Sequence, residues 1–236
     1  FGTTDAIIVG VRPHSNSVLD GQTLALIDRL STALGELEAV DEVLSLTNAQ
    51  HIVGSPYGME VVALYDPDEG EAVTRLQERL ADWPEAYDGN LVSVDRSMAT
   101  IIVRPLAGID TPAQDRLLDS VRAVIASGQS EETSISIVGL PVIKQEINRS
   151  LMADLVVLAP IVAIIIVAVL YLSFKRLTSV IFPLLALFVA AALIVAVIAL
   201  SGITFTMATM LVPVLLLVVG SAYGIHVMSH FQAETA

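Results

Sequence analysis

Several features are missing from this sequence of 236 residues, and each absence excludes a class of chemistry. There is no cysteine, which excludes disulfides, thiolate metal sites and cysteine nucleophiles. Basic residues are scarce: 12 Lys and Arg stand against 25 Asp and Glu, and the net charge of −13 argues against nucleic acid as a partner, because phosphates are bound by clustered cations. The sequence also contains no Walker loop, no GxSxG elbow and no HExxH motif. We therefore expect neither an enzyme nor a cofactor.

One long segment of the sequence contains no charged residues. Residues 177–233, 57 positions in succession, contain no Asp, Glu, Lys or Arg, so His226 and His230 are their only side chains that readily ionise near neutral pH. Residues 1–150, by contrast, hold 23 acidic and 10 basic residues, the mixed composition of a water-soluble domain. The composition therefore predicts two domains, an acidic domain over residues 1–150 and a membrane domain over residues 151–236.

The membrane domain is long enough for three spanning helices. Twenty uncharged residues separate Asp154 from Lys175, and a helix of that length reaches about 30 Å, the thickness of the bilayer hydrocarbon. The uncharged run that follows is too long for one span and breaks at Ser201 and Gly202. These lengths predict an all-α segment with spans at about 154–174, 178–200 and 207–230.

The few basic residues near the spans predict the orientation. Lys175 and Arg176 are the only Lys and Arg after Arg149, and the positive-inside rule places their short loop in the cytoplasm. Residues 1–150 then lie on the extracytoplasmic side, and the protein is a multi-pass protein of the cytoplasmic membrane. Because the chain begins at Phe1 rather than Met, we interpret it as a fragment whose first membrane helix has been removed.

The acidic domain alternates between strand and helix patterns. Runs rich in β-branched residues predict strands over residues 6–11, 40–48, 98–106 and 133–139. Apolar residues at helical spacing predict a helix over residues 20–37, with Asp20 as a candidate N-cap, and a second helix over residues 111–128. The order βαββαβ predicts an α+β domain of the ferredoxin-like type. Residues 49–97 interrupt this order with a strand candidate at 59–65 and a short helix near 69–81, and we expect this insertion to contact partners.

Four short motifs lie near the ends of the predicted membrane helices. They are Gly139-Leu140-Pro141-Val142 with Glu146, Phe174-Lys175-Arg176, Gly202-Ile203-Thr204, and Ala222-Tyr223-Gly224-Ile225-His226. Together with the topology, they resemble the resistance-nodulation-division (RND) superfamily of transporters, most closely its hydrophobe-exporter and MmpL-like branch. The resemblance covers essentially the whole chain, as a porter-type domain followed by the second, third and fourth membrane helices. It implies that a second half, in the same chain or in a paired chain, completes the transporter.

The resemblance also implies where the driving proton is carried, and here the sequence departs from the family. The family's fourth helix commonly carries a GxxxDY-type motif whose Asp binds and releases the proton. Matching Tyr223 to that Tyr places Ala222 at the Asp position, and alanine cannot titrate. His226 lies one helical turn from Ala222, and its imidazole is a candidate substitute. Tyr223 is either a second member of this relay or an ordinary buried tyrosine.

Each of these residues also has a plainer structural interpretation. Counted from Met207, His226 is about 28 Å along its helix, close to the cytoplasmic interface, where a histidine can simply contact headgroups or the helix end. His226 and His230 have the spacing of metal ligands but lack the intervening Glu and a third ligand, so we expect no metal. Gly220 and Gly224 most simply permit close helix packing.

Three functions fit the sequence. The first is a transporter that uses the proton motive force to export lipids or other hydrophobic or amphiphilic compounds. Its partners would be membrane lipids, this substrate, the second half of the transporter and, in an oligomer, further copies of itself. The second is a non-pumping lipid-sensing or scaffolding protein of the sterol-sensing type, which Ala222 favours. The third is a protein-translocation accessory similar to SecD and SecF. We expect the exporter.

Overall fold

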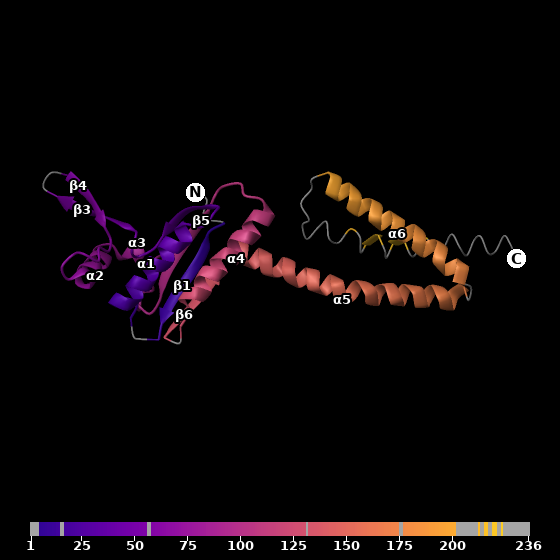
Figure 1. Ribbon diagram of the computed structural model, residues 1–236, viewed down its shortest axis with the longest axis horizontal. Coiled ribbons are helices and arrows are strands. Elements are labelled where there is room, and N and C mark those ends of the chain that lie inside the picture. The colour runs from indigo at the N-terminus through magenta and orange to yellow at the C-terminus, as the bar shows by residue number, and fades with distance from the viewer. Residues whose placement is uncertain are drawn as a thin grey trace. The chain divides into compact units, whose positions relative to one another are not determined.

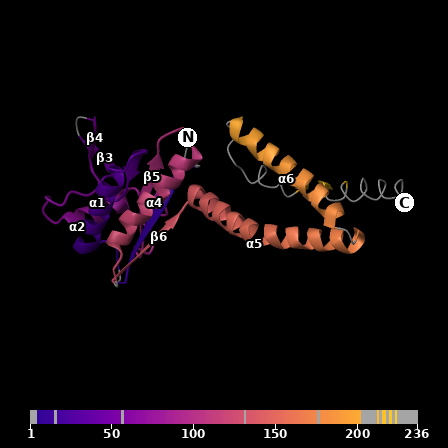
Figure 2. The same ribbon diagram turned by 45° about the vertical axis from the view of Figure 1, so that its right-hand side comes forward.

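The computed structural model describes residues 5–14, 17–55, 58–130, 132–174 and 177–201, together with residues 212, 215, 216, 219, 220 and 223. The chain divides into two compact units, Phe1–Glu146 and Ile147–Ala236. The first unit is a sheet covered by helices, and the described part of the second unit is helical (Figures 1 and 2).

The first unit is built on a four-stranded antiparallel sheet with the strand order β2-β5-β1-β6. Its strands are β1 (Ile7–Pro13), β2 (Val40–Leu44), β5 (Ala99–Pro105) and β6 (Thr133–Val138). β1 lies inside the sheet, where Ile8 is opposite Ile102 of β5 and Val138 of β6. The structure thereby confirms an α+β domain with an antiparallel sheet.

Two helices, α1 (Gly21–Gly35) and α4 (Thr111–Gly128), lie side by side over this sheet (Figure 1). Four apolar residues of α1 recur at helical spacing and are buried in the core, namely Leu24, Ile27, Leu30 and Leu34. Asp20 is the N-cap of α1, as predicted: its carboxylate accepts hydrogen bonds from the backbone N–H groups of Gln22 and Thr23. The periodic apolar residues and the cap together explain where α1 begins and which face it buries.

The second strand ends earlier than the pattern of residues 40–48 predicts. β2 stops at Leu44 because the side chain of Asn48 folds back on the preceding backbone. The amide oxygen of Asn48 accepts a hydrogen bond from the Ser45 N–H at 2.7 Å, and its amide nitrogen donates to the backbone oxygen of Val43 at 2.8 Å. These local bonds compete with the ladder and turn the chain away from the sheet.

Residues 49–97 form elements of their own between β2 and β5. They comprise the hairpin of β3 (Gln50–Ser55) and β4 (Gly58–Ala63), the helix α2 (Ala72–Asp82) and the one-turn helix α3 (Pro84–Tyr87). The hairpin is a separate two-stranded sheet that extends from the rest of the unit (Figure 1). The strand predicted at 59–65 and the helix predicted near 69–81 are confirmed as β4 and α2, whereas β3 and α3 have no counterpart among the sequence predictions.

The membrane candidates follow β6. α5 (Leu140–Phe174) starts in the first unit and continues without interruption, and α6 (Leu177–Leu200) comes next. Among the described residues, Leu140–Val169 is the one helix long and apolar enough to cross a membrane, and Phe188–Leu200 is a shorter apolar helix. The third predicted span, 207–230, lies almost entirely outside the described residues. The structure thus contains one candidate membrane helix in its described part.

Candidate functional site

The proposed relay lies largely outside the described part of the chain. Gly220 and Tyr223 are helical positions, and the side chain of Tyr223 is 69% exposed. The remaining residues of this site, Ala222, Gly224, His226 and His230, lie outside the described residues. Their roles in proton transfer and helix packing therefore stay predictions.

The start of α5 is where the polar domain continues into the apolar helices. The chain leaves β6 through Gly139, whose φ of +145° is accessible to glycine but strained for other residues. A Cβ atom at this position would lie 2.6 Å from the backbone oxygen of Ala6. Gly139 therefore lets the turn before α5 pack closely against the residue that precedes β1.

The first two turns of α5 are held by contacts within the domain. The side chain of Gln145 is only 9% exposed and accepts a hydrogen bond from Arg122 of α4. It also donates a hydrogen bond to a backbone oxygen of α4. Val142 packs against the hydrophobic core. The ion pair of Lys144 with Asp5, with 3.6 Å between nitrogen and oxygen, joins two exposed side chains and contributes little. Buried contacts, more than surface charge, therefore fix the start of α5.

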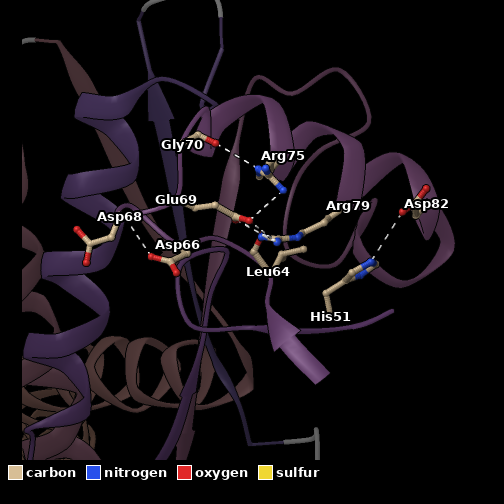
Figure 3. Close-up of polar contacts among 9 residues, drawn as sticks. All are labelled: His51, Leu64, Asp66, Asp68, Glu69, Gly70, Arg75, Arg79 and Asp82. Atoms are coloured by element: carbon tan, nitrogen blue, oxygen red, sulfur yellow. Dashed lines mark hydrogen bonds and ion pairs between the residues drawn. The ribbon is translucent and has the colours of Figure 1, made fainter. Parts of the chain in front are cut away.

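A cluster of ion pairs in the insertion compensates for a weak helix start. Glu71, the N-cap of α2, has a φ of +61° and makes no capping hydrogen bond with its side chain. Glu69 instead pairs with Arg75 at 3.2 Å and with Arg79 at 3.0 Å. Arg79 also donates a hydrogen bond to the backbone oxygen of Leu64, the residue after β4 (Figure 3). The cluster thus ties α2 to the end of the hairpin.

The one buried histidine among the described residues lies at the base of this hairpin. His51 of β3 is 2% exposed. Its Nδ1 atom lies 2.9 Å from the hydroxyl oxygen of Tyr87 in α3, and its Nε2 atom lies 3.9 Å from a carboxylate oxygen of Asp82 in α2. The Tyr87 hydroxyl also lies 3.4 Å from the backbone oxygen of Gln50, to which it can donate its one proton, and Trp83 meets the imidazole edge-on. The cluster joins β3 to both α2 and α3.

Sequence reasoning did not identify the His51 cluster. Its members are up to 37 positions apart in the chain, so no local pattern connects them. The one available signal is a histidine directly before the apolar pair Ile52 and Val53 in β3. Burial raises the pKa of the Tyr87 hydroxyl, so this group stays neutral and acts as a hydrogen-bond partner.

Two carboxylates of the domain have lowered pKa values, and both serve local structure. Burial would raise the pKa of Asp20, but hydrogen bonds from the Thr23 hydroxyl and from two backbone N–H groups outweigh this effect and lower it. Hydrogen bonds from the hydroxyls of Ser93 and Ser97, with a further bond from a backbone N–H, lower the pKa of Asp95 to about 2. Within the described ranges, no three His, Asp or Glu side chains are grouped so that they could hold a metal ion.

The polar α+β domain is followed in the chain by α5, which among the described residues is the one helix long and apolar enough to cross a membrane, and this succession is typical of a membrane protein. The profile of the MMPL family matches residues 3–236, so the chain belongs to the MMPL family, and the RND and MmpL-like assignment is confirmed. Members of this family are transporters of hydrophobic substrates in membranes rather than enzymes. No curated protein matches the chain.

Proposed function

We propose that this chain is part of an RND-type transporter that uses the proton motive force to export lipids or other hydrophobic or amphiphilic compounds. The observation that carries the proposal is the family match over residues 3–236. In this proposal the chain works with a second half of the transporter, in the same or a paired chain, and a homo-oligomer is compatible with it.

The first unit is then a ferredoxin-like porter domain on the extracytoplasmic side, over about residues 1–150 with its insertion at about 49–97. The succession β1-α1-β2-β5-α4-β6 supports this, because it is the βαββαβ order of that fold. The membrane domain covers residues 151–236 with spans at about 154–174, 178–200 and 207–230. The pair Lys175-Arg176 is cytoplasmic, as the positive-inside rule requires.

Proton coupling is assigned to the third of these spans. Ala222 occupies the position of the family's Asp, so His226 carries the proton and Tyr223 assists it by hydrogen bonding. An ionisable group inside a span is costly, which supports a functional role for the histidine. Gly220 and Gly224 allow a neighbouring helix to pack closely.

The coupling reaches the porter domain through α5. This helix is continuous from Leu140 to Phe174, and its first turns are fixed by Val142 and by the hydrogen bonds of Gln145. A shift of the helix along its axis would therefore pull on α4 and the sheet. A non-pumping lipid sensor is the alternative, and the family match does not favour it.

Efflux from living cells tests the proposal. Cells producing the full-length protein are loaded with a lipophilic fluorescent dye or a labelled phospholipid, and the loss of label is followed with and without a protonophore. The proposal predicts efflux above that of cells without the protein, and its collapse on uncoupling. Efflux that survives complete uncoupling would contradict proton coupling.

A further inference from the structure

We propose that His51 is a proton-dependent latch, which holds the β3–β4 hairpin against α2 and α3 more firmly when its imidazole is doubly protonated. The inference concerns the insertion alone and does not depend on the proposed transport activity. His51 is 2% exposed, and each of its ring nitrogens faces a polar partner.

The number of available protons decides which contacts can form together. A neutral imidazole carries one N–H, and the Tyr87 hydroxyl carries one proton. If the imidazole proton is on Nε2, facing Asp82, Tyr87 must donate to Nδ1 and cannot also donate to the backbone oxygen of Gln50. If the proton is on Nδ1, Tyr87 can donate to Gln50, but the lone pair of Nε2 then faces the Asp82 carboxylate.

The doubly protonated imidazole removes this conflict. Nδ1–H donates to the Tyr87 oxygen at 2.9 Å, and Tyr87 in turn donates to the backbone oxygen of Gln50 at 3.4 Å. Nε2–H meanwhile faces the Asp82 carboxylate across 3.9 Å as an ion pair. All three contacts are satisfied only in this state. An ordinary histidine changes charge between about pH 5 and 8, and this range sets the two pH values of the test.

The elements around His51 carry both acidic and basic groups. Asp82 on α2 faces the imidazole directly. Glu60 of β4 lies on the same face of the hairpin as His51, since the strand register places Val62 opposite His51 and side chains alternate. The cation of α2 near this site, Arg79, is already paired with Glu69 (Figure 3). α3 contributes Tyr87, which stays neutral because burial raises its pKa.

The latch matters because the hairpin has few other supports. A two-stranded sheet is marginally stable in water by itself. The face opposite to that of His51 carries Ile52, Met59 and Val61, which are exposed by 39%, 84% and 57%. Contacts at the base of the hairpin therefore determine how rigidly this apolar face is held relative to α2 and α3. At acidic pH the hairpin is held in place, and at higher pH it is freer to move.

Hydrogen exchange of the hairpin amides tests the latch in the full chain in detergent micelles. After correction for intrinsic exchange, amides of residues 50–55 and 58–63 should exchange at least about threefold more slowly at pH 5.5 than at pH 7.5. The reason is that protonation of His51 stabilises the docked hairpin, in which the imidazole has its polar partners. His51→Gln should abolish this difference. His14→Gln, at an exposed histidine of the same domain, should leave it unchanged.

A second variant covers the case in which His51→Gln disturbs folding. Asp82 is 73% exposed, so Asp82→Asn removes the facing charge with little effect on packing, and it should reduce the pH difference in the hairpin. Equal protection of the wild-type hairpin at both pH values would overturn the latch. So would a pH difference that persists in full in both His51→Gln and Asp82→Asn. Neither result depends on whether the protein transports anything.

Discussion

Ala222 is the residue that we expect at the position of the proton-carrying Asp of the RND superfamily, and this assignment stays a prediction. A driving proton needs a group that changes its charge, and alanine has none. His226 is the nearest side chain of the same predicted helix that ordinarily ionises near neutral pH, and it lies one turn away. A neutral imidazole is also less costly to place in an apolar span than a carboxylate is. We therefore propose that one histidine fills the role that the resemblance to the RND superfamily implies for an acid.

The N-cap of α1 offers a residue-scale prediction with a defined pH dependence. Asp20→Ala should lower the free energy of unfolding at pH 7 by about 1 kcal/mol, because two N–H groups lose their acceptor. Since the pKa of Asp20 is lowered in the folded state, its stabilising effect exists above the unfolded pKa and is lost as the pH falls through the folded pKa. The difference between wild type and variant should accordingly shrink as the pH falls below 3.8, the ordinary pKa of an aspartate. Urea unfolding followed by the fluorescence of Trp83, the only tryptophan of the chain, measures it.

The matched control for Asp20 is Asp28→Ala on the same helix. Asp28 is exposed and caps nothing, so its removal should change the free energy of unfolding by less than about 0.5 kcal/mol at either pH. An equal loss of stability in both variants would show that the effect comes from the charge of the helix and not from the cap.

At the scale of elements, α5 is the central feature. It is one continuous helix whose first turns belong to the folded domain and whose remainder is apolar and exposed. Gly139 sets its starting point, because only a residue without Cβ fits beside the backbone oxygen of Ala6. A helix fixed in this way can transmit displacement, whereas a flexible linker would absorb it.

Gly139→Ala tests this fixed start. Both the collision at 2.6 Å and the positive φ oppose a side chain, so the domain should lose more than about 1 kcal/mol of unfolding free energy, as measured through Trp83 fluorescence. Gly21→Ala is the control: it lies in the first turn of α1 with no atom within 4 Å of the added Cβ, and it should be neutral or slightly stabilising. Unchanged stability in Gly139→Ala would mean that the turn before α5 adjusts freely.

The elements differ in how far the sequence predicts them, for physical reasons. β1 is predictable because it is a run rich in β-branched residues, and α1 because its apolar residues recur at helical spacing and bury one face. β3 is not, because only two of its residues are large and apolar and both are exposed. The predicted membrane span begins at residue 154, whereas α5 begins at Leu140. The first turns of α5 contain charged residues, so their composition alone assigns them to the soluble domain and does not predict a helix there. The His51 cluster is not predictable because it depends on contacts between distant residues.

At the scale of the whole molecule, proton-driven export requires one defined orientation of the protein in the membrane. The acidic domain must face outward and the loop at Lys175 and Arg176 inward, since the second half of the transporter and the proton gradient act across the same bilayer. The absence of cysteine from these 236 residues helps to test this, because an introduced thiol is the only one within them.

Labelling in whole cells, or in spheroplasts where there is an outer membrane, measures the orientation. Asp68→Cys places a thiol at an exposed position of the insertion, and it should react with an impermeant maleimide. Lys175→Cys should react only after the cells are permeabilised. The opposite pattern would overturn the proposed topology and with it the direction of transport.

The most direct test of proton-driven export by this chain is efflux of a lipophilic label from cells with the full-length protein, comparing wild type, His226→Gln and His230→Gln at equal abundance in the membrane. The account predicts that a protonophore and His226→Gln each abolish efflux, whereas His230→Gln retains most of it, and that Ala222→Asp in the His226→Gln background restores part of it. Full efflux by His226→Gln that still collapses on uncoupling would remove this histidine from the mechanism. The absence of efflux in the wild type, with transport gained by Ala222→Asp alone, would contradict the account and indicate a relative that binds lipid without pumping it.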